Sequence, residues 1–403
     1  MSGIVLSINA GSSSLKVSLF APTFDGPKHL ATCNVSSIGA EGTSFSSTSK
    51  AVSEEEKGMN NVQDHDSALQ HILRHLFRTT TSQEDITHVC HRVVHGGEYK
   101  EHIKIDTDAL HHLEALTELA PLHNASAVAL IRSCLKQLPN TMSIAWFDTT
   151  FHQSIPSHIY TFPIDQELAK KYGLRKYGFH GISYSFIVRN VAEFLKKPTF
   201  TTNLIILHLG SGASACCVKN GQSLDTSMSL TPLAGLPGAT RSGSIDPNAI
   251  LHLMKKSQTS IYDAETVLNK KSGWKSLTQT SSFGDIVESD EASKRLAFDI
   301  FVDRILDFVG AYYVKLGGQV DALVFAGGIG EKSPQLRRAV ADKCSCLGFK
   351  LHEVNNVSTD KEELSKTVRS IGHGEKGILV CETNEQFEMA YQCMRDEKLY
   401  SRD

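Results

Sequence analysis

One local pattern occurs twice in this chain, about 200 residues apart. Near the N-terminus, the apolar segments 3–9 and 15–20 flank a Gly/Ser turn. The same plan returns in the apolar segments 204–209 and 215–218, which flank residues 210–214. Two short apolar runs around a polar, glycine-containing turn are typical of a β-hairpin. The repetition predicts two related domains, each beginning with a hairpin whose turn is sized for a phosphate, because backbone N–H groups in such turns bind anions.

A third glycine-rich segment follows the apolar run 322–326 and ends at Gly330. It precedes Ser333-Pro334, a pair that predicts the start of a helix. A single glycine turn is weak evidence for phosphate binding, but three of similar layout at strand ends are a stronger indication. The P-loop pattern, the protein-kinase catalytic-loop set and a complete dinucleotide fingerprint are all missing from the sequence.

Periodicity predicts the remaining elements. Apolar residues at helical spacing predict helices over 67–77, 108–119, 124–135, 292–316 and 383–395. Residues 86–94 and 142–147 are predicted strands, the second of which ends at Asp148. The segment from Ser36 to about Asp64 is rich in Ser, Gly and Glu and is interpreted as an irregular surface excursion.

Bulk properties exclude several classes of protein. A length of 403 residues favours two domains, and a net charge of −3 argues against a nucleic acid partner. The apolar runs are too short for a bilayer, and the N-terminus reads as a strand rather than a signal peptide, so we expect a cytoplasmic protein with no membrane partner. The nine cysteines have irregular spacing and are interpreted as buried free thiols in a reducing compartment. Neither Cys344 and Cys346 nor His91 and His95 make a convincing metal site.

The arrangement of two hairpins and a third glycine segment resembles the superfamily of actin, hexokinase and the heat-shock chaperone ATPases. Within it, eight segments resemble the acetate kinases (acetokinase family), in the family's order and over nearly the whole chain. These segments are 9–16 (NAGSSSLK), 91–98 (HRVVHGGE), 147–152 (FDTTFH), 177–181 (YGFHG), 208–214 (HLGSGAS), 238–243 (GATRSG), 327–331 (GGIGE) and 383–385 (TNE).

The resemblance implies an α/β fold of two domains with a duplicated ribonuclease-H-like βββαβαβα core and an active-site cleft between them. The first domain would comprise residues 1–149 plus 386–403, and the second residues 150–385. The implied activity is reversible, Mg²⁺-dependent (or Mn²⁺-dependent) in-line transfer of the ATP γ-phosphoryl group to acetate, giving acetyl phosphate and ADP. The family also suggests a homodimer.

Phosphoryl transfer to a carboxylate needs positioning and charge neutralisation rather than a general base, because the acceptor is already an anion. The resemblance implies that Arg92 holds the carboxylate substrate and that Arg241 stabilises the group in transfer. It implies that His180 donates to a phosphoryl oxygen, with His123 as a weaker candidate. Asp148 is also catalytic in this interpretation, and orienting an arginine or contacting Mg²⁺ through water is physically easier for it than acting as a base.

The same resemblance assigns the binding residues. Asn9 and Glu385 match the metal-associated positions, and the acetate pocket would be lined by Val94, Leu122, Phe179 and Pro232 beside Arg92. The nucleotide would contact Lys16, Ser12, Ser14, His208, Leu209, Gly210, Ser211, Gly212, Ser282, Phe283, Gly284, Gly328, Ile329, Gly330, Glu331 and Lys332.

Two segments depart from the family pattern on the nucleotide side. Ser211 stands where the family usually has asparagine, and residues 282–284 lack the family's aspartate and arginine. A non-ATP phosphoryl donor such as pyrophosphate is therefore one alternative. A propionate or butyrate kinase is a second alternative, and a non-catalytic nucleotide-binding or sugar-sensing protein of the superfamily is a third.

Overall fold

The computed structural model describes residues 3–11, 13–49, 53–59, 61–118 and 121–400, without the side chains of 118 and 121–123. The chain divides into two compact units. The first comprises Met1–Thr150, Gly181–Ser183 and Asn384–Asp403, and the second comprises Phe151–His180 and Tyr184–Thr383. The domain division drawn from the sequence stays a prediction. The units differ from it in placing residues 150, 181–183 and 384–385 with the first unit.

Among the described residues, the first unit has an eight-stranded sheet in the order β5-β4-β3-β2-β1-β6-β8-β7. The strands β1, β2 and β3 are antiparallel neighbours, whereas β1, β6 and β8 run parallel. The bounds are β1 Ile4–Ala10, β2 Ser14–Thr23, β3 Gly26–Ser36, β4 Ser44–Ser49, β5 Ser53–Lys57, β6 Ile86–Val93, β7 Ile103–Lys104 and β8 Met142–Phe147.

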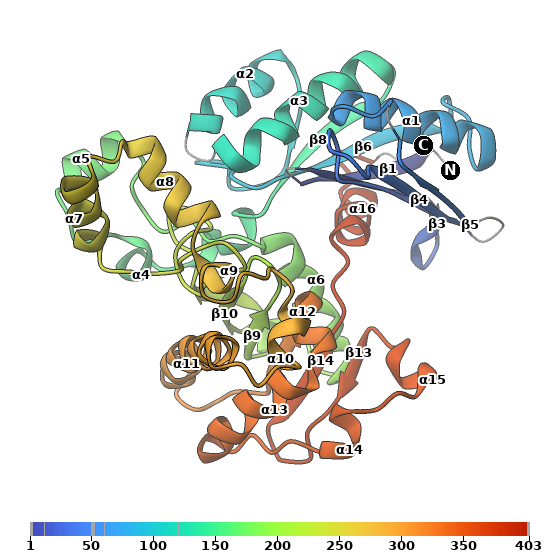
Figure 1. The fold of residues 1–403 in the computed structure, drawn as a ribbon. Coiled ribbons are helices and arrows are strands. Elements are labelled where there is room, and N and C mark those ends of the chain that lie inside the picture. Colours follow the sequence, from blue (N-terminus) through green and yellow to red (C-terminus); the bar gives the residue numbers. More distant parts are fainter. Residues whose placement is uncertain (1–2, 12, 50–52, 60, 119–120, 401–403) are drawn as a thin grey trace. The chain divides into compact units, whose positions relative to one another are not determined.

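Helices cover both faces of this sheet, because successive side chains of a strand point to opposite faces. Leu6 and Ile8 of β1 pack in one core with residues of α1 and α3, whereas Val5 packs in another with Met389 of α16. Figure 1 shows α16 on the face of the sheet opposite α1 and α3. The bounds are α1 His65–Thr79, α2 Thr107–Ala115, α3 Pro121–Gln137 and α16 Glu385–Arg395.

The interpretation of residues 36–64 as an irregular excursion was wrong for part of that segment. Strands β4 and β5 lie there and extend the sheet beyond β3. The side chains of Phe45 and Ser47 point into the protein and are buried. Serine and threonine fill most of β4, so the strand lacks the strong apolar alternation by which strands are recognised in a sequence.

The second unit has, among the described residues, a six-stranded sheet in the order β11-β10-β9-β12-β14-β13. Its strands are β9 Leu204–His208, β10 Ser214–Lys219, β11 Gln222–Thr226, β12 Ala322–Ala326, β13 Val368–Ser370 and β14 Gly377–Cys381. Its helices are α4 Ser157–Tyr160, α5 Gln166–Lys171, α6 Gly181–Phe194 (whose first three residues group with the first unit), α7 Pro247–Ser257, α8 Ile261–Lys270, α9 Gly273–Thr278, α10 Phe283–Val287, α11 Ala292–Lys315, α12 Gly327–Lys332, α13 Pro334–Lys343, α14 Glu353–Asn356 and α15 Lys361–Leu364.

The two sheets share one topology. The run β11-β10-β9-β12-β14 repeats the order and strand directions of β3-β2-β1-β6-β8, with three antiparallel strands followed by two parallel ones. On one face of the second sheet, α11 and α13 pack against β9, β10, β12 and β14 through residues such as Phe301 and Leu336. The predicted α/β fold with a duplicated core is therefore confirmed.

The predicted helices occur with shifted ends. The α-helix predicted at 108–119 ends at Ala115 and is followed by the 3₁₀ helix Leu116–Glu118, and residue 119 lies outside the described part. The third glycine segment is a helix, α12, rather than the turn expected after a strand. Gly327 has a φ of 72°, and a Cβ there would lie 2.7 Å from the carbonyl oxygen of Leu209. A glycine is therefore required where the chain leaves β12. Among the described residues, no helix is long and apolar enough to cross a membrane.

Candidate active site

Arg92 and Asp148 form a buried ion pair at one edge of the first sheet. Arg92 donates from Nε to Oδ1 of Asp148 at 3.0 Å and from Nη2 to Oδ2 at 2.7 Å. The Asp148 side chain is 1% exposed and that of Arg92 17%. The two residues meet because β6 and β8 are parallel neighbours with Val93 beside Phe147. The two-pronged contact holds the guanidinium in one orientation.

Asn9 and Glu385 complete this cluster from other parts of the chain. Nη1 of Arg92 donates to Oδ1 of Asn9 at 3.1 Å and lies 3.3 Å from Oε2 of Glu385. The amide nitrogen of Asn9 donates to the same Glu385 oxygen at 2.7 Å. The cluster thus brings together four positions in the first unit: the end of β1, the end of β6, the residue after β8 and the first residue of α16.

The charges of the cluster do not cancel: two carboxylates face one guanidinium, a formal balance of −1. Burial by itself would lower the pKa of Arg92, but Asp148 and Glu385 outweigh it and hold that pKa well above its usual range. Carboxylate and amide oxygens are ligands that Mg²⁺ takes, usually one or two from the protein with water completing the shell. Asn9 and Glu385 therefore fit a magnesium ion in chemistry and in charge.

The turn of the first hairpin is held from outside the sheet. The amide of Gly11 donates to the carbonyl of Ser14 at 2.9 Å, and His65, the first residue of α1, donates from Nε2 to the carbonyl of Gly11 at 2.8 Å. Lys16 and Ser14 on β2 are exposed. Ser12 lies outside the described residues, so its expected nucleotide contact stays a prediction.

In the second unit, His180 precedes α6 with a left-handed backbone, at φ 59°. Its Nδ1 lies 2.8 Å from Oγ of Ser214, the first residue of β10, and its ring lies 4.3 Å from that of His208. The hydroxyl of Tyr184 reaches the same Ser214 oxygen at 2.5 Å. His180 is therefore placed beside the second hairpin, where His208 ends β9.

His152 supports the backbone immediately before His180. Its Nε2 donates to the carbonyl of Phe179 at 2.9 Å, and its Nδ1 accepts from the hydroxyl of Ser223 at 2.8 Å. Burial lowers the pKa of His152 to about 4 even though the bond to Phe179 opposes that shift. The ring is therefore neutral at pH 7, with its proton on Nε2.

Arg241 also lies against the second hairpin. A Cβ on Gly212 would come within 2.9 Å of Nη1 of Arg241, so the absence of a side chain at position 212 admits the guanidinium. The amide of Ala239 donates to the carbonyl of Ser211 at 2.8 Å, which fastens the loop that carries Arg241 to the hairpin turn. The structure thus brings Arg241, His180 and His208 to one turn within the second unit.

Helix α12 adjoins the same turn from β12. The amides of Ile329 and Gly330 donate to the carbonyl of Leu209 at 2.8 and 3.3 Å. Arg337 supports the far end of α12, because Nη1 donates to the carbonyls of Gly330 and Glu331 at 2.9 and 2.8 Å. The predicted nucleotide segments 208–212 and 328–332 are therefore neighbours. The pKa of Glu331 is raised by burial.

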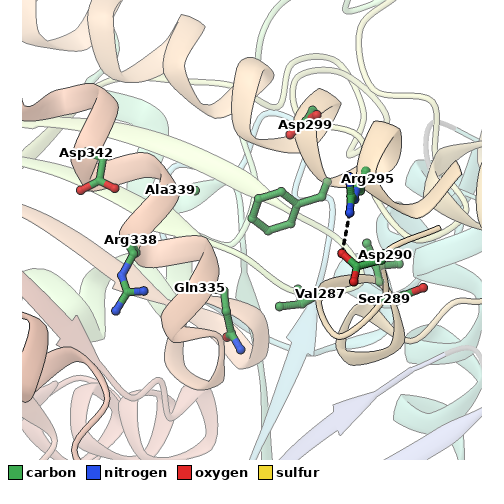
Figure 2. Close-up of a pocket in the computed structure, with 11 residues that line it drawn as sticks. Val287, Ser289, Asp290, Arg295, Asp299, Gln335, Arg338, Ala339 and Asp342 are labelled. Atoms are coloured by element: carbon green, nitrogen blue, oxygen red, sulfur yellow. Dashed lines mark hydrogen bonds and ion pairs between the residues drawn. The ribbon is translucent and has the colours of Figure 1, made fainter. Parts of the chain in front are cut away.

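A cavity of about 440 Å³ lies between α10, α11 and α13, as Figure 2 shows. Its apolar lining residues are Ile286, Val287, Phe298 and Ala339, and its other lining residues are Ser289, Asp290, Arg295, Asp299, Gln335, Arg338 and Asp342. Arg295 and Asp290, which both line the cavity, form an ion pair at 2.6 Å. The segments 282–284 and 328–332 adjoin helices that line the cavity, because Phe283 and Gly284 are the first residues of α10 and because α13 directly follows α12.

The segment 282–284 is itself divided between core and surface. Ser282 is exposed and caps α10, accepting from the amide of Asp285, and Gly284 is exposed beside it. The ring of Phe283 packs edge-on against Trp274 and Phe301 in the core. Any nucleotide contact at this segment therefore falls to Ser282, Gly284 and the backbone.

The expected acetate-pocket residues are split between the units. Val94 follows β6 in the first unit, whereas Phe179 and Pro232 are buried in the second. The side chains of Leu122 and His123 lie outside the described part. The composition of the acetate pocket therefore stays a prediction.

Among the described residues, His65, His152, Ser183 and Ser214 contact candidate site groups but were given no role from the sequence. His152 and Ser214 lie within the family-like segments 147–152 and 208–214, whereas His65 and Ser183 lie outside all eight segments. Ser183 donates to Oε1 of Glu385 at 2.8 Å. Serine and histidine are common in loops and cores alike, so their types alone carried no signal. The family-like segment 177–181 ends two residues before Ser183.

Comparison with known proteins agrees with these segments. Residues 4–391 match the model of the acetokinase family. A probable acetate kinase of Emericella nidulans is 46% identical, over 98% of both chains. A propionate kinase structure from Francisella tularensis superposes with a TM-score of 0.88 at 32% identity, over 97% of this chain and 98% of that one. An acetate kinase structure from Porphyromonas gingivalis does so with a TM-score of 0.85 at 29% identity, over 98% and 99%. With the family model spanning nearly its whole length, the chain belongs to the acetokinase family and is a phosphotransferase with a carboxyl group as acceptor.

Proposed function

We propose that the protein is an acetate kinase that transfers the γ-phosphoryl group of ATP reversibly to acetate, with Mg²⁺ as cofactor and by direct in-line displacement. The observation that carries this proposal is the cluster of Arg92, Asp148, Asn9 and Glu385. It offers an immobilised positive charge for an anionic acceptor next to oxygen ligands for a divalent cation.

The reaction as proposed needs no proton transfer. An acetate oxygen forms its bond to the γ-phosphorus while the bond from phosphorus to the bridging oxygen breaks, and the electron pair leaves with ADP. Every nitrogen of the Arg92 guanidinium contacts a protein group, so a substrate carboxylate shares that charge with Asp148 and Glu385. Mg²⁺ held through Asn9 and Glu385 would neutralise phosphate charge.

In the second unit, we propose that His180 and Arg241 face the phosphoryl group from the hairpin 208–214. Hydrogen-bond donors held in advance toward developing charge stabilise a transition state without reorganisation. The bond of His180 to Ser214 and the packing of Arg241 on Gly212 provide such preorganisation. Asp148 serves to orient Arg92 rather than as a base.

The primary test is a steady-state assay of the purified protein with acetate, propionate and butyrate as acceptors and with ATP and pyrophosphate as donors. We expect acetate with ATP to give the highest kcat/KM. A methylene group in an apolar pocket is worth about 1–3 kcal/mol, so propionate should react about 10- to 200-fold less well. Preference for propionate would support the alternative that the Francisella tularensis structure represents. Exclusive use of pyrophosphate would overturn ATP as donor.

We further propose that the cavity between α10, α11 and α13 receives the nucleoside of the donor. Its volume of about 440 Å³ suits a small ligand, and its combination of apolar and charged lining residues suits a planar base with a polar edge. Residues 282–284, which lack the family's aspartate and arginine, are not among the residues that line this cavity.

Ala339→Trp places a large side chain in the cavity and is expected to raise the KM for ATP at least about tenfold, because the loss of an apolar contact between ligand and pocket accounts for a factor of this size. The KM for acetate should stay within about twofold of wild type. Ser293→Trp is the matched control, because Ser293 is exposed on α11 and does not line the cavity. Steady-state kinetics of both variants decide the matter. An unchanged KM for ATP in folded Ala339→Trp would place the nucleoside elsewhere.

We also propose that the protein is a cytoplasmic homodimer that has no nucleic acid or membrane partner. The 11-residue helix α7 has no buried residue among those described. Leu251 of α7 and Ile261 and Tyr262 of α8 are largely exposed. Exposed apolar side chains on neighbouring helices are typical of a surface that a second subunit covers.

A further inference from the structure

Ser183 is a buried serine whose hydroxyl is directed at the candidate metal residue Glu385. It lies in the first turn of α6, has no exposed surface and donates to Oε1 of Glu385 at 2.8 Å. The two residues are separated by 202 positions in the sequence. Both belong to the first unit, although most of α6 belongs to the second.

The two oxygens of Glu385 have different partners. Oε1 accepts from Ser183, whereas Oε2 accepts from the amide of Asn9 at 2.7 Å and lies 3.3 Å from Nη1 of Arg92. Without the serine hydroxyl, the carboxylate keeps contacts on one oxygen only and is free to rotate toward a closer, two-pronged pairing with Arg92. Such a pairing would occupy the oxygen lone pairs that a cation requires.

We propose that Ser183 is a positioning residue, which holds the Glu385 carboxylate in the orientation that a divalent cation needs and thereby sets the cation affinity of the site. The inference rests on the proposed function, in which Asn9 and Glu385 hold Mg²⁺. Groups that orient a metal-associated side chain typically affect metal affinity or activity by about 10- to 100-fold when they are removed. Ser183 does not touch the reacting atoms in this proposal.

The test compares Ser183→Ala with wild type and with Ser18→Ala. Ser18 is a matched control because it is also a buried serine of the first unit, and its hydroxyl bonds Thr32 across β2 and β3 at 2.8 Å. The direct readout is the Kd of Mn²⁺ for each protein in the presence of ADP, from the electron paramagnetic resonance signal of free Mn²⁺. The second readout is the Mg²⁺ concentration that gives half-maximal rate at saturating ATP and acetate.

We expect the Mn²⁺ Kd and the half-maximal Mg²⁺ concentration of Ser183→Ala to rise about tenfold. The KM for acetate should stay near that of wild type, and the rate should recover at high Mg²⁺. Ser18→Ala should match wild type in both readouts. A Mn²⁺ Kd for Ser183→Ala within twofold of wild type would overturn the proposal, as would a rate loss that Mg²⁺ does not restore.

Two further measurements keep the result interpretable. If Ser183→Ala does not fold, as judged by circular dichroism, Ser183→Cys provides a side chain of similar shape and weaker donor strength, for which the same rise in Kd is expected. The wild-type assay separates this inference from the proposed function. A wild-type protein that binds Mn²⁺ but does not phosphorylate acetate would refute the proposed function alone. An active wild type, together with a Ser183→Ala variant whose Mn²⁺ Kd equals that of wild type, would refute the role of Ser183 alone.

Discussion

Replacing Arg241 by alanine is expected to lower kcat by about 10³-fold, the scale of loss when an arginine that stabilises a phosphoryl-transfer transition state is removed. The guanidinium packs against Gly212 in the turn of the second hairpin, on a loop tied to that turn by the bond from Ala239 to Ser211. Charge that spreads over the phosphoryl oxygens there would lose its fixed countercharge. The measurement is kcat at saturating substrates in both reaction directions.

The control for this variant is Arg369→Ala, which removes another arginine of the second unit. Arg369 is buried in β13 and donates to the carbonyl of Asn355 at 3.4 Å. Its loss should affect thermal unfolding more than kcat. Arg241→Lys should recover only part of the activity, because a lysine presents one charged point rather than a planar fork. Near-normal kcat in folded Arg241→Ala would refute the catalytic role.

Arg92→Ala is expected to damage both activity and stability. It should lower kcat/KM for acetate by at least about 10²-fold, as the loss of a preorganised charge in an active site does. It also leaves Asp148, which is 1% exposed, without its ion-pair partner. An uncompensated buried charge costs about 3–5 kcal/mol, so the free energy of unfolding should fall by about 3 kcal/mol after allowance for the partial exposure of Arg92. Steady-state kinetics and denaturant unfolding measure the two effects.

The double variant Arg92→Ala/Asp148→Asn separates these effects. Removing the Asp148 charge as well should restore part of the lost stability, because the more deeply buried of the two carboxylates is then no longer an unpaired ion. Glu385 still loses its contact with Arg92 but keeps its hydrogen bonds from Asn9 and Ser183. Activity should stay as low as in Arg92→Ala. Recovery of activity together with stability would show that Arg92 has only a structural role.

Much of the fold could be predicted because its signals are local. Apolar runs and helical periodicity indicated most strands and helices, and the repeated strand–turn–strand plan indicated the duplication that the two sheet orders confirm. The prediction failed where the local signal was weak. Strand β4 consists mostly of Ser and Thr and owes its place to pairing with β3. Helix α12 begins at glycines that read as a turn, and its contact with Leu209 decides its conformation.

The candidate site shows the same division. By itself, the sequence determined which chemical groups are available, in which order, and that they belong to an acetokinase, because motifs are local strings of residue types. Only the tertiary structure decided that Arg92 pairs with Asp148, 56 positions away, and that Glu385 meets Asn9 across 376 positions. It also brought the hydroxyl of Ser183 to Glu385. Such pairings depend on strand register and helix placement to within a hydrogen-bond length, which no local pattern of residues encodes.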